Sequence, residues 1–168
     1  MNSIEPSGPV FNYAVSATAL TTAGPSDLFC ITAPSNSRVA VREIRIGQYT
    51  EFADAQAELC PLLIMTGSTA ISGGTALTGA NVRRHSGAPT AGSSVSGPST
   101  TVASTASATV LLADSWNVAA GFYWKPDPIE RVIIEPSARF VIRTGTPNDA
   151  LTLNATLVLQ EIGKPAAT

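Results

Sequence analysis

The chain has 168 residues, of which 44% are hydrophobic and only 13% charged, and its formal net charge is −2 at pH 7. This length suits one domain that buries a core without disulfides or metal ions. Only ten Lys and Arg residues are present, mostly spread along strands, so a nucleic-acid-binding surface is disfavoured. The low charge suits a protein that packs against neighbours, although low-charge all-β domains also exist without such a role.

Residues 1–9 are predicted to form an extended N-terminal arm. They lack the basic and apolar regions of a signal peptide, and no segment of the chain approaches the roughly 18 consecutive apolar residues that span a bilayer. We therefore expect a protein that is made inside a cell and has no membrane partner. Ile4 and Pro6 of the arm are candidate interaction residues.

In the first half of the chain, alternating apolar and polar residues predict strands at residues 11–20, 28–32, 38–46 and 59–66. Within 38–46, the two valines and two isoleucines share a face only if one residue is inserted near Arg42 and Glu43, which predicts a β-bulge. In the fourth strand, Pro61 indicates an edge strand or a bulge, because proline cannot donate a backbone hydrogen bond.

Residues 67–109 form a long excursion that is rich in Gly, Ser, Thr, Ala and Pro and lacks sustained periodicity. Structureless stretches of this length are unusual inside a compact domain. The excursion is interpreted either as a flexible surface insertion or as a segment that becomes ordered on a partner. Arg83 and Arg84 within it are candidates for pairing with acidic groups of a neighbouring subunit, or are simply a solvated pair.

The second half predicts strands at residues 102–112, 118–124, 131–135, 139–143 and 151–161. The last is the clearest, because four leucines and an alanine alternate with polar residues. Eight or nine strands with short turns predict an all-β fold, an antiparallel β-sandwich of jelly-roll type. This domain is expected to span residues 10–162 and to be followed by a C-terminal tail at 163–168.

Two segments, 31–42 and 133–143, share a pattern of strand, Pro-Ser turn, arginine and alternating apolar residues ending in arginine. Proline at a turn presets φ, and serine can bond nearby backbone groups. The similarity predicts two hairpins in corresponding places of a two-sheet sandwich, unless Pro-Ser hairpins in general have this pattern.

Residues suited to catalysis or metal binding are few. His85 is the single histidine, and it follows two arginines in the excursion, where a general base would be poorly held. Cys30 and Cys60 lie in apolar contexts and are interpreted as buried thiols rather than a disulfide. The sequence has no zinc spacing, calcium loop or phosphate loop. We therefore expect no catalytic residues, no cofactor and no metal.

The one concentration of recognition-type side chains comprises four aromatic residues, Trp116, Phe122, Tyr123 and Trp124, of which Trp116, Tyr123 and Trp124 are the candidates for interaction. Such aromatic residues are enriched at interfaces, and they are also ordinary core residues. Alternation places Phe122 and Trp124 on one face of a strand and Tyr123 on the other. These aromatics are therefore candidate interaction residues, with at least two of the four expected in the core.

Several segments resemble small virion proteins of tailed bacteriophages. They are Trp-Asn-Val-Ala-Ala-Gly-Phe-Tyr-Trp-Lys-Pro at 116–126, Ile-Ile-Glu-Pro-Ser-Ala-Arg-Phe at 133–140, Asp-Ala-Leu-Thr-Leu at 149–153, Gln-Glu-Ile-Gly at 160–163, and Ile-Ser-Gly-Gly-Thr-Ala-Leu-Thr at 71–78. The resemblance implies a β-sandwich that forms a homo-oligomer, with a trimer favoured, and attaches to a capsid or tail lattice. No functional residue carries over by position.

A head decoration or cement protein is therefore expected, bound to the major capsid protein or to other virion proteins and located in virions assembled in the host cytoplasm. One alternative is a tail-tip or fibre domain that binds a host surface glycan through Trp116, Tyr123 and Trp124. A second alternative is a small jelly-roll coat protein, although the chain lacks a basic arm for packaging RNA.

Overall fold

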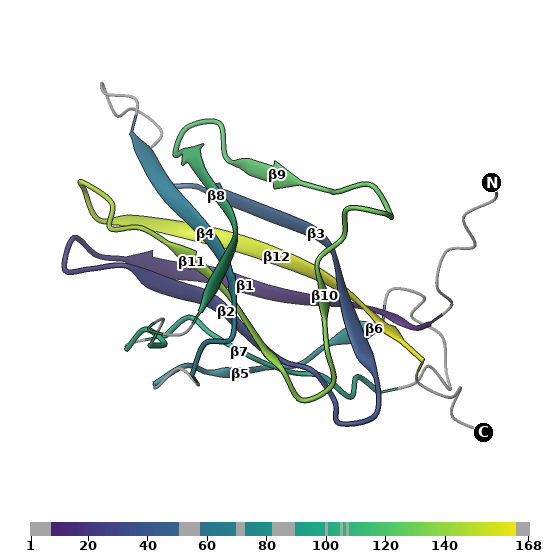
Figure 1. Ribbon diagram of the computed structural model, residues 1–168. Coiled ribbons are helices and arrows are strands. Elements are labelled where there is room, and N and C mark those ends of the chain that lie inside the picture. Colours follow the sequence, from purple (N-terminus) through teal and green to yellow (C-terminus); the bar gives the residue numbers. More distant parts are fainter. Residues whose placement is uncertain are drawn as a thin grey trace.

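The computed structural model describes residues 8–50, 58–69, 73–81, 90–99, 101–104, 106 and 108–163. Within these ranges every regular element is a β-strand, and the strands form two antiparallel sheets (Figure 1). The two sheets share one hydrophobic core. The all-β sandwich predicted from the sequence is confirmed.

The two sheets, called A and B here, have different strand orders. Sheet A has the order β10 (Ile133–Ile134), β3 (Arg38–Gln48), β12 (Leu151–Ile162), β1 (Val10–Leu20) and β6 (Ala80–Asn81), and β9 (Phe122–Trp124) also pairs with β3. Sheet B has the order β5 (Ala76–Leu77), β7 (Ser94–Ser96), β2 (Ser26–Thr32), β11 (Arg139–Thr144), β4 (Leu59–Thr66) and β8 (Thr109–Asn117).

The core lies between the sheets and follows the period-two pattern of the sequence. In β12 the alternate residues from Leu151 to Leu159 are buried, while Asn154 is exposed on the other side. Each fully buried leucine contributes about 1.5–3 kcal/mol relative to an exposed one. A one-residue slip would turn this whole set away from the core, so the register of β12 is strongly specified.

The predicted bulge in β3 is confirmed. Val158 of β12 pairs with Glu43 and Leu159 pairs with Val41, which leaves Arg42 as the inserted residue. The insertion keeps the valines and isoleucines of β3 on the core side. With this insertion, the alternation of buried and outward residues in β3 stays in step with the uninterrupted alternation in β12.

The expectation for Pro61 is wrong, because β4 is not an edge strand and its register shift lies elsewhere, between Ile64 and Met65. Pro61 lies near the start of β4. The ladder between β4 and β11 ends at Leu62, the residue that follows Pro61 in the sequence. The Pro61 carbonyl accepts a hydrogen bond from the Gly145 N–H at 2.7 Å. The missing proline N–H is tolerated there because the ladder with β11 ends at Leu62, whereas the pairing with β8 continues to Leu59.

The described part of residues 67–109 belongs to the sandwich rather than forming a structureless insertion. Strands β5 and β7 extend sheet B beside β2, and β6 pairs with β1. Val95 and Ala103 are buried. The strand predicted at 102–112 is displaced, because β8 begins at Thr109 and continues to Asn117 along β4. Arg83, Arg84 and His85 lie outside the described residues.

The two similar segments are not hairpins but corners that carry the chain between the sheets. β2 and β3 lie in different sheets, as do β10 and β11, and the two corners pair with each other. The Ala33 N–H donates to the Ala138 carbonyl at 3.0 Å, and the Ser137 N–H donates to the Pro34 carbonyl at 3.1 Å. The repeated Pro-Ser sequence therefore forms one end of the sandwich.

Candidate functional site

The three candidate aromatic residues do not form one cluster. Trp116 is in the core at 1% exposure, and its indole N–H donates to the Thr144 hydroxyl at 3.2 Å. Tyr123 is 62% exposed, whereas Phe122 and Trp124 pack against the core as partly buried residues. The alternation predicted for β9 is confirmed. The other four candidate residues, Ile4, Pro6, Arg83 and Arg84, lie outside the described residues.

Tyr123 interacts with neighbouring charged groups of β3. The Arg45 guanidinium lies 5.9 Å from the centre of the Tyr123 ring, within the range of a cation–π contact. Arg45 also forms an ion pair with Glu43, whose hydrogen bond raises the pKa of this arginine. Tyr123 is therefore part of the outer surface of sheet A.

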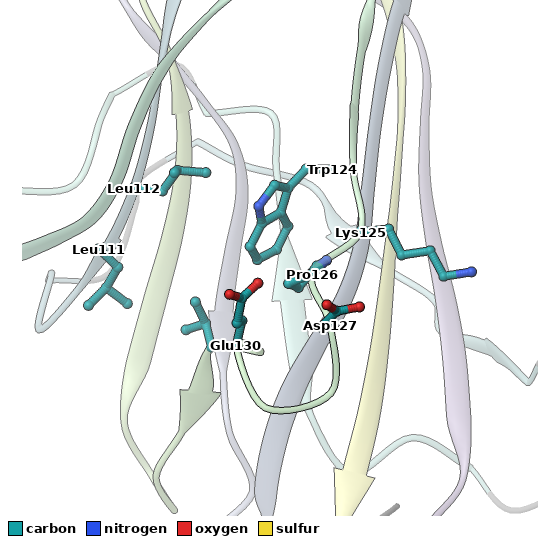
Figure 2. A pocket seen from close by; sticks show the side chains of 8 residues that line it. Leu111, Leu112, Trp124, Lys125, Pro126, Asp127 and Glu130 are labelled. Carbon is teal, nitrogen blue, oxygen red and sulfur yellow. The ribbon is translucent and has the colours of Figure 1, made fainter.

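A groove lies where the edges of the two sheets approach each other (Figure 2). Its volume is about 450 Å³. Sheet B contributes one wall through β8, and the segment from β9 to β10 contributes the other. The lining residues are Leu111, Leu112, Trp124, Lys125, Pro126, Asp127, Glu130 and Val132. We call this feature the Trp124 groove.

A tight turn places two carboxylates in the Trp124 groove. The Glu130 N–H donates to the Asp127 carbonyl at 2.9 Å, which closes a turn over residues 127–130. Aspartate at the first position and Pro128 at the second are favoured in such turns. In Figure 2 the Glu130 carboxylate points toward the Trp124 indole, while Lys125 extends away from the ring.

The local sequence contained a signal for this site, although only its aromatic residue was identified as a candidate. Asp127 and Glu130 were missed because acidic residues in a Pro-rich turn are usually solvated surface groups. The informative combination is a tryptophan at a strand end followed within six residues by an Asp-Pro turn and a second carboxylate. The apolar wall from β8 could not be inferred, because it depends on the packing of the two sheets.

The outer faces of the two sheets differ. The outer face of sheet B is covered by the chain itself over only part of its area, where Ala103 packs against Cys30, Met65 and Val141 in a second buried cluster. Leu59 of β4 and Val110 and Ala113 of β8 are exposed. The outer face of sheet A is exposed over its central part, at Ala14, Asn154 and Arg45. We call the outward side of β1, β12 and β3 the open face.

Buried polar contacts attach parts of the 90–104 region to the sandwich. The Glu161 carboxylate is fully buried and accepts hydrogen bonds from the Gly92 N–H at 2.7 Å and the Ser93 N–H at 2.6 Å. The Tyr13 hydroxyl lies 2.9 Å from the Ser93 hydroxyl, and burial raises the pKa of the Tyr13 phenol. These contacts explain how a segment without periodicity is held in place.

The two cysteines are buried, as predicted, and no disulfide joins them. Cys60 belongs to the main core and Cys30 to the cluster on the outer face of sheet B. Burial raises the pKa of the Cys60 thiol to about 11, with a further contribution from the Glu58 carboxylate. Such a thiol is a poor nucleophile at neutral pH.

In the described ranges, no group of three or more His, Cys, Asp or Glu side chains is arranged to hold a metal ion. A helix long and apolar enough to cross a membrane is also not found in that part of the chain. No protein-family model, curated protein or solved structure matches this chain.

Proposed function

We propose that this chain is a non-enzymatic structural protein of a virion, a decoration protein that binds the lattice of the major capsid protein. It forms a homo-oligomer, with a trimer favoured. The sequence resemblance motivates this proposal. The observation that carries it is the difference between the outer faces of the two sheets, because one is partly covered by the chain itself and the other is open over its central part.

The open face has the chemistry of an assembly surface. Its central side chains are small or uncharged, as at Ala14, Asn154 and Thr156. The charges of Glu43 and Arg45 neutralise each other in an ion pair. Arg42 and Lys125 line a pocket on this face together with that pair, so a partner must pair or desolvate these charges. A specific interface need not be more apolar than the remaining surface.

A symmetric oligomer would repeat this face around its axis. Several copies of one weak contact then act together on the capsid lattice, so the attachment is much tighter than any single contact. The arm predicted at residues 1–9, of which 1–7 lie outside the described residues, is proposed as a further contact to a neighbouring subunit. Removal of the arm tests that contribution separately from the contribution of the open face.

We also interpret the connectivity as a jelly roll. Apart from the short strands β6 and β9, sheet A follows the order β1-β12-β3-β10, and apart from the short strands β5 and β7, sheet B follows the order β2-β11-β4-β8. Successive strands from β1 to β4 therefore alternate between the sheets, and so do β10, β11 and β12. Jelly rolls with this two-sheet arrangement occur in viral capsid domains, which supports the proposed setting.

The first experiment is size-exclusion chromatography with light scattering on the purified protein, alone and mixed with undecorated phage capsids. We expect a discrete oligomer that co-elutes with the capsids. A monomer that does not associate with capsids would contradict the proposal. Closed shells formed by the protein alone would instead support the coat-protein alternative.

A further inference from the structure

We propose that the Trp124 groove binds a saccharide, with one pyranose ring against the Trp124 indole and its hydroxyl groups on Asp127 and Glu130. This inference goes beyond the proposed structural role and does not depend on it. It also differs from a glycan site built on Trp116, Tyr123 and Trp124 together, because Trp116 is buried and Tyr123 lies on the other face of β9.

Trp124 provides the flat surface that such a ring needs. The face of an indole carries partial negative charge and attracts the weakly positive C–H groups on the apolar side of a pyranose. Trp124 is held on β9, where it pairs with Ile44 of β3, and it packs against the core. The platform is therefore fixed before a ligand arrives, which lowers the entropic cost of binding.

Asp127 and Glu130 provide the hydrogen-bond acceptors. Ionised carboxylates accept hydrogen bonds at both oxygens, and a sugar presents several hydroxyl donors along one edge. Among the residues that the structure describes, neither carboxylate forms an ion pair or a side-chain hydrogen bond, and both are exposed. Their acceptor capacity is available to a ligand.

The opposite wall makes the site amphipathic. Leu111 and Leu112 of β8 and Val132 near β10 line the groove together with the charged turn. The volume of about 450 Å³ lies within the range of ordinary ligand pockets, about 300–1,000 Å³. A ligand with one apolar face and one hydroxyl-bearing edge matches both halves of this lining.

An organic cation is the main competing ligand, because carboxylates and an aromatic ring can also attract an ammonium group. Quaternary ammonium groups are bound by cages of several aromatic rings. The Trp124 groove has one aromatic residue among its lining residues and two aliphatic residues on the facing strand. These features favour the saccharide.

The test uses the full chain with neutral sugars, by saturation-transfer NMR on glucose, galactose, mannose, N-acetylglucosamine and N-acetylgalactosamine at about 10 mM, a concentration that detects millimolar affinity. A printed glycan array extends the test to oligosaccharides, and choline serves as the cationic probe. We expect at least one saccharide to bind and choline not to bind.

Substitutions then locate the site. Trp124→Ala should weaken binding by at least about tenfold, whereas the matched control Tyr123→Ala, on the same strand but facing outward, should leave it unchanged. Because Trp124 also packs on the core, Asp127→Asn and Glu130→Gln provide nearly isosteric changes at exposed positions and should each weaken binding several-fold.

The proposal is overturned if no saccharide binds, if choline alone binds, or if binding survives all three groove substitutions. None of these outcomes bears on capsid association, which is measured separately. Conversely, failure to bind capsids would leave the saccharide result intact.

Discussion

Arg143 and Asp27 form a paired contact across the neighbouring strands β11 and β2. The arginine Nε lies 2.6 Å from Oδ1 of the aspartate, and its Nη2 lies 3.1 Å from Oδ2. The Asp27 side chain is fully buried. Both side chains also bind the backbone of Ala103, whose N–H donates to Asp27 and whose carbonyl accepts from Arg143. The pair therefore attaches the 101–104 segment to the outer face of sheet B.

Removing either member of this pair should be strongly destabilising. Asp27→Ala leaves a largely buried guanidinium without its counter-charge, and we expect a loss of about 3–5 kcal/mol in the free energy of unfolding. The control is Arg38→Ala, which breaks an ion pair with Glu135 whose side chains are 59% and 61% exposed. That change should cost less than about 1 kcal/mol. Urea denaturation measures both, and similar losses would contradict this account.

Among the residues that the structure describes, two non-glycine residues have positive φ and should favour glycine. Ala17, at the register shift of β1, has φ 52°, and Ser137, in the second Pro-Ser corner, has φ 62°. A Cβ atom is disfavoured in this region, so Ala17→Gly and Ser137→Gly should each raise the free energy of unfolding by about 0.5–1 kcal/mol.

The control for these substitutions is Ala14→Gly, at an exposed position in the regular part of the same strand. Here glycine only adds backbone freedom to the unfolded state, so stability should fall by about 0.5–1 kcal/mol. Thermal unfolding distinguishes the two directions. A decrease at Ala17 equal to that at Ala14 would show that the positive φ carries no cost.

The buried Cys60 thiol should make stability depend on alkaline pH. Its pKa is raised from 9.0 to about 11 in the folded protein, so the unfolded chain releases this proton first as pH rises. The associated stability is fully present below pH 9 and is lost as pH rises toward 11. Replacing Cys60 with Ala should flatten this part of the stability profile, measured by denaturation at several pH values. If the slope of stability against pH were the same in Cys60→Ala as in the unmodified protein, the raised pKa of Cys60 would be refuted as its cause.

The strands could be predicted from the sequence wherever the burial pattern is local. The strand expected at 59–66 coincides with β4, and that at 151–161 differs from β12 by one residue. The bulge near Arg42 was predictable because it interrupts an otherwise regular alternation. In these places the alternation of apolar and polar residues indicates which face of the strand is buried.

Features that depend on distant contacts could not be predicted in this way. Strand β7 has three residues and no periodicity, and it is positioned by pairing with β2 and β5. The Pro-Ser corners have the local sequence of hairpins, and only the partner strands show that they cross between sheets. Likewise, Trp124 was identified from its residue type, whereas its groove requires β8 of the other sheet.

The open face can be tested by a matched pair of alanine substitutions. Ala14 is exposed on the open face in β1, and Ala113 is exposed in β8 of sheet B. Arginine at position 14 would place a bulky, hydrated charge in the proposed contact with the capsid or a neighbouring subunit. Arginine at position 113 adds the same charge to the other sheet.

We expect Ala14→Arg to reduce capsid co-elution by at least about tenfold, because an unpaired charge buried in an interface costs several kcal/mol. Ala113→Arg should bind like the unmodified protein. Circular dichroism should show that both variants fold, since both side chains point into solvent in the isolated chain. If Ala113→Arg abolishes co-elution and Ala14→Arg does not, the lattice contact belongs to sheet B. The open face would then have to be explained in another way.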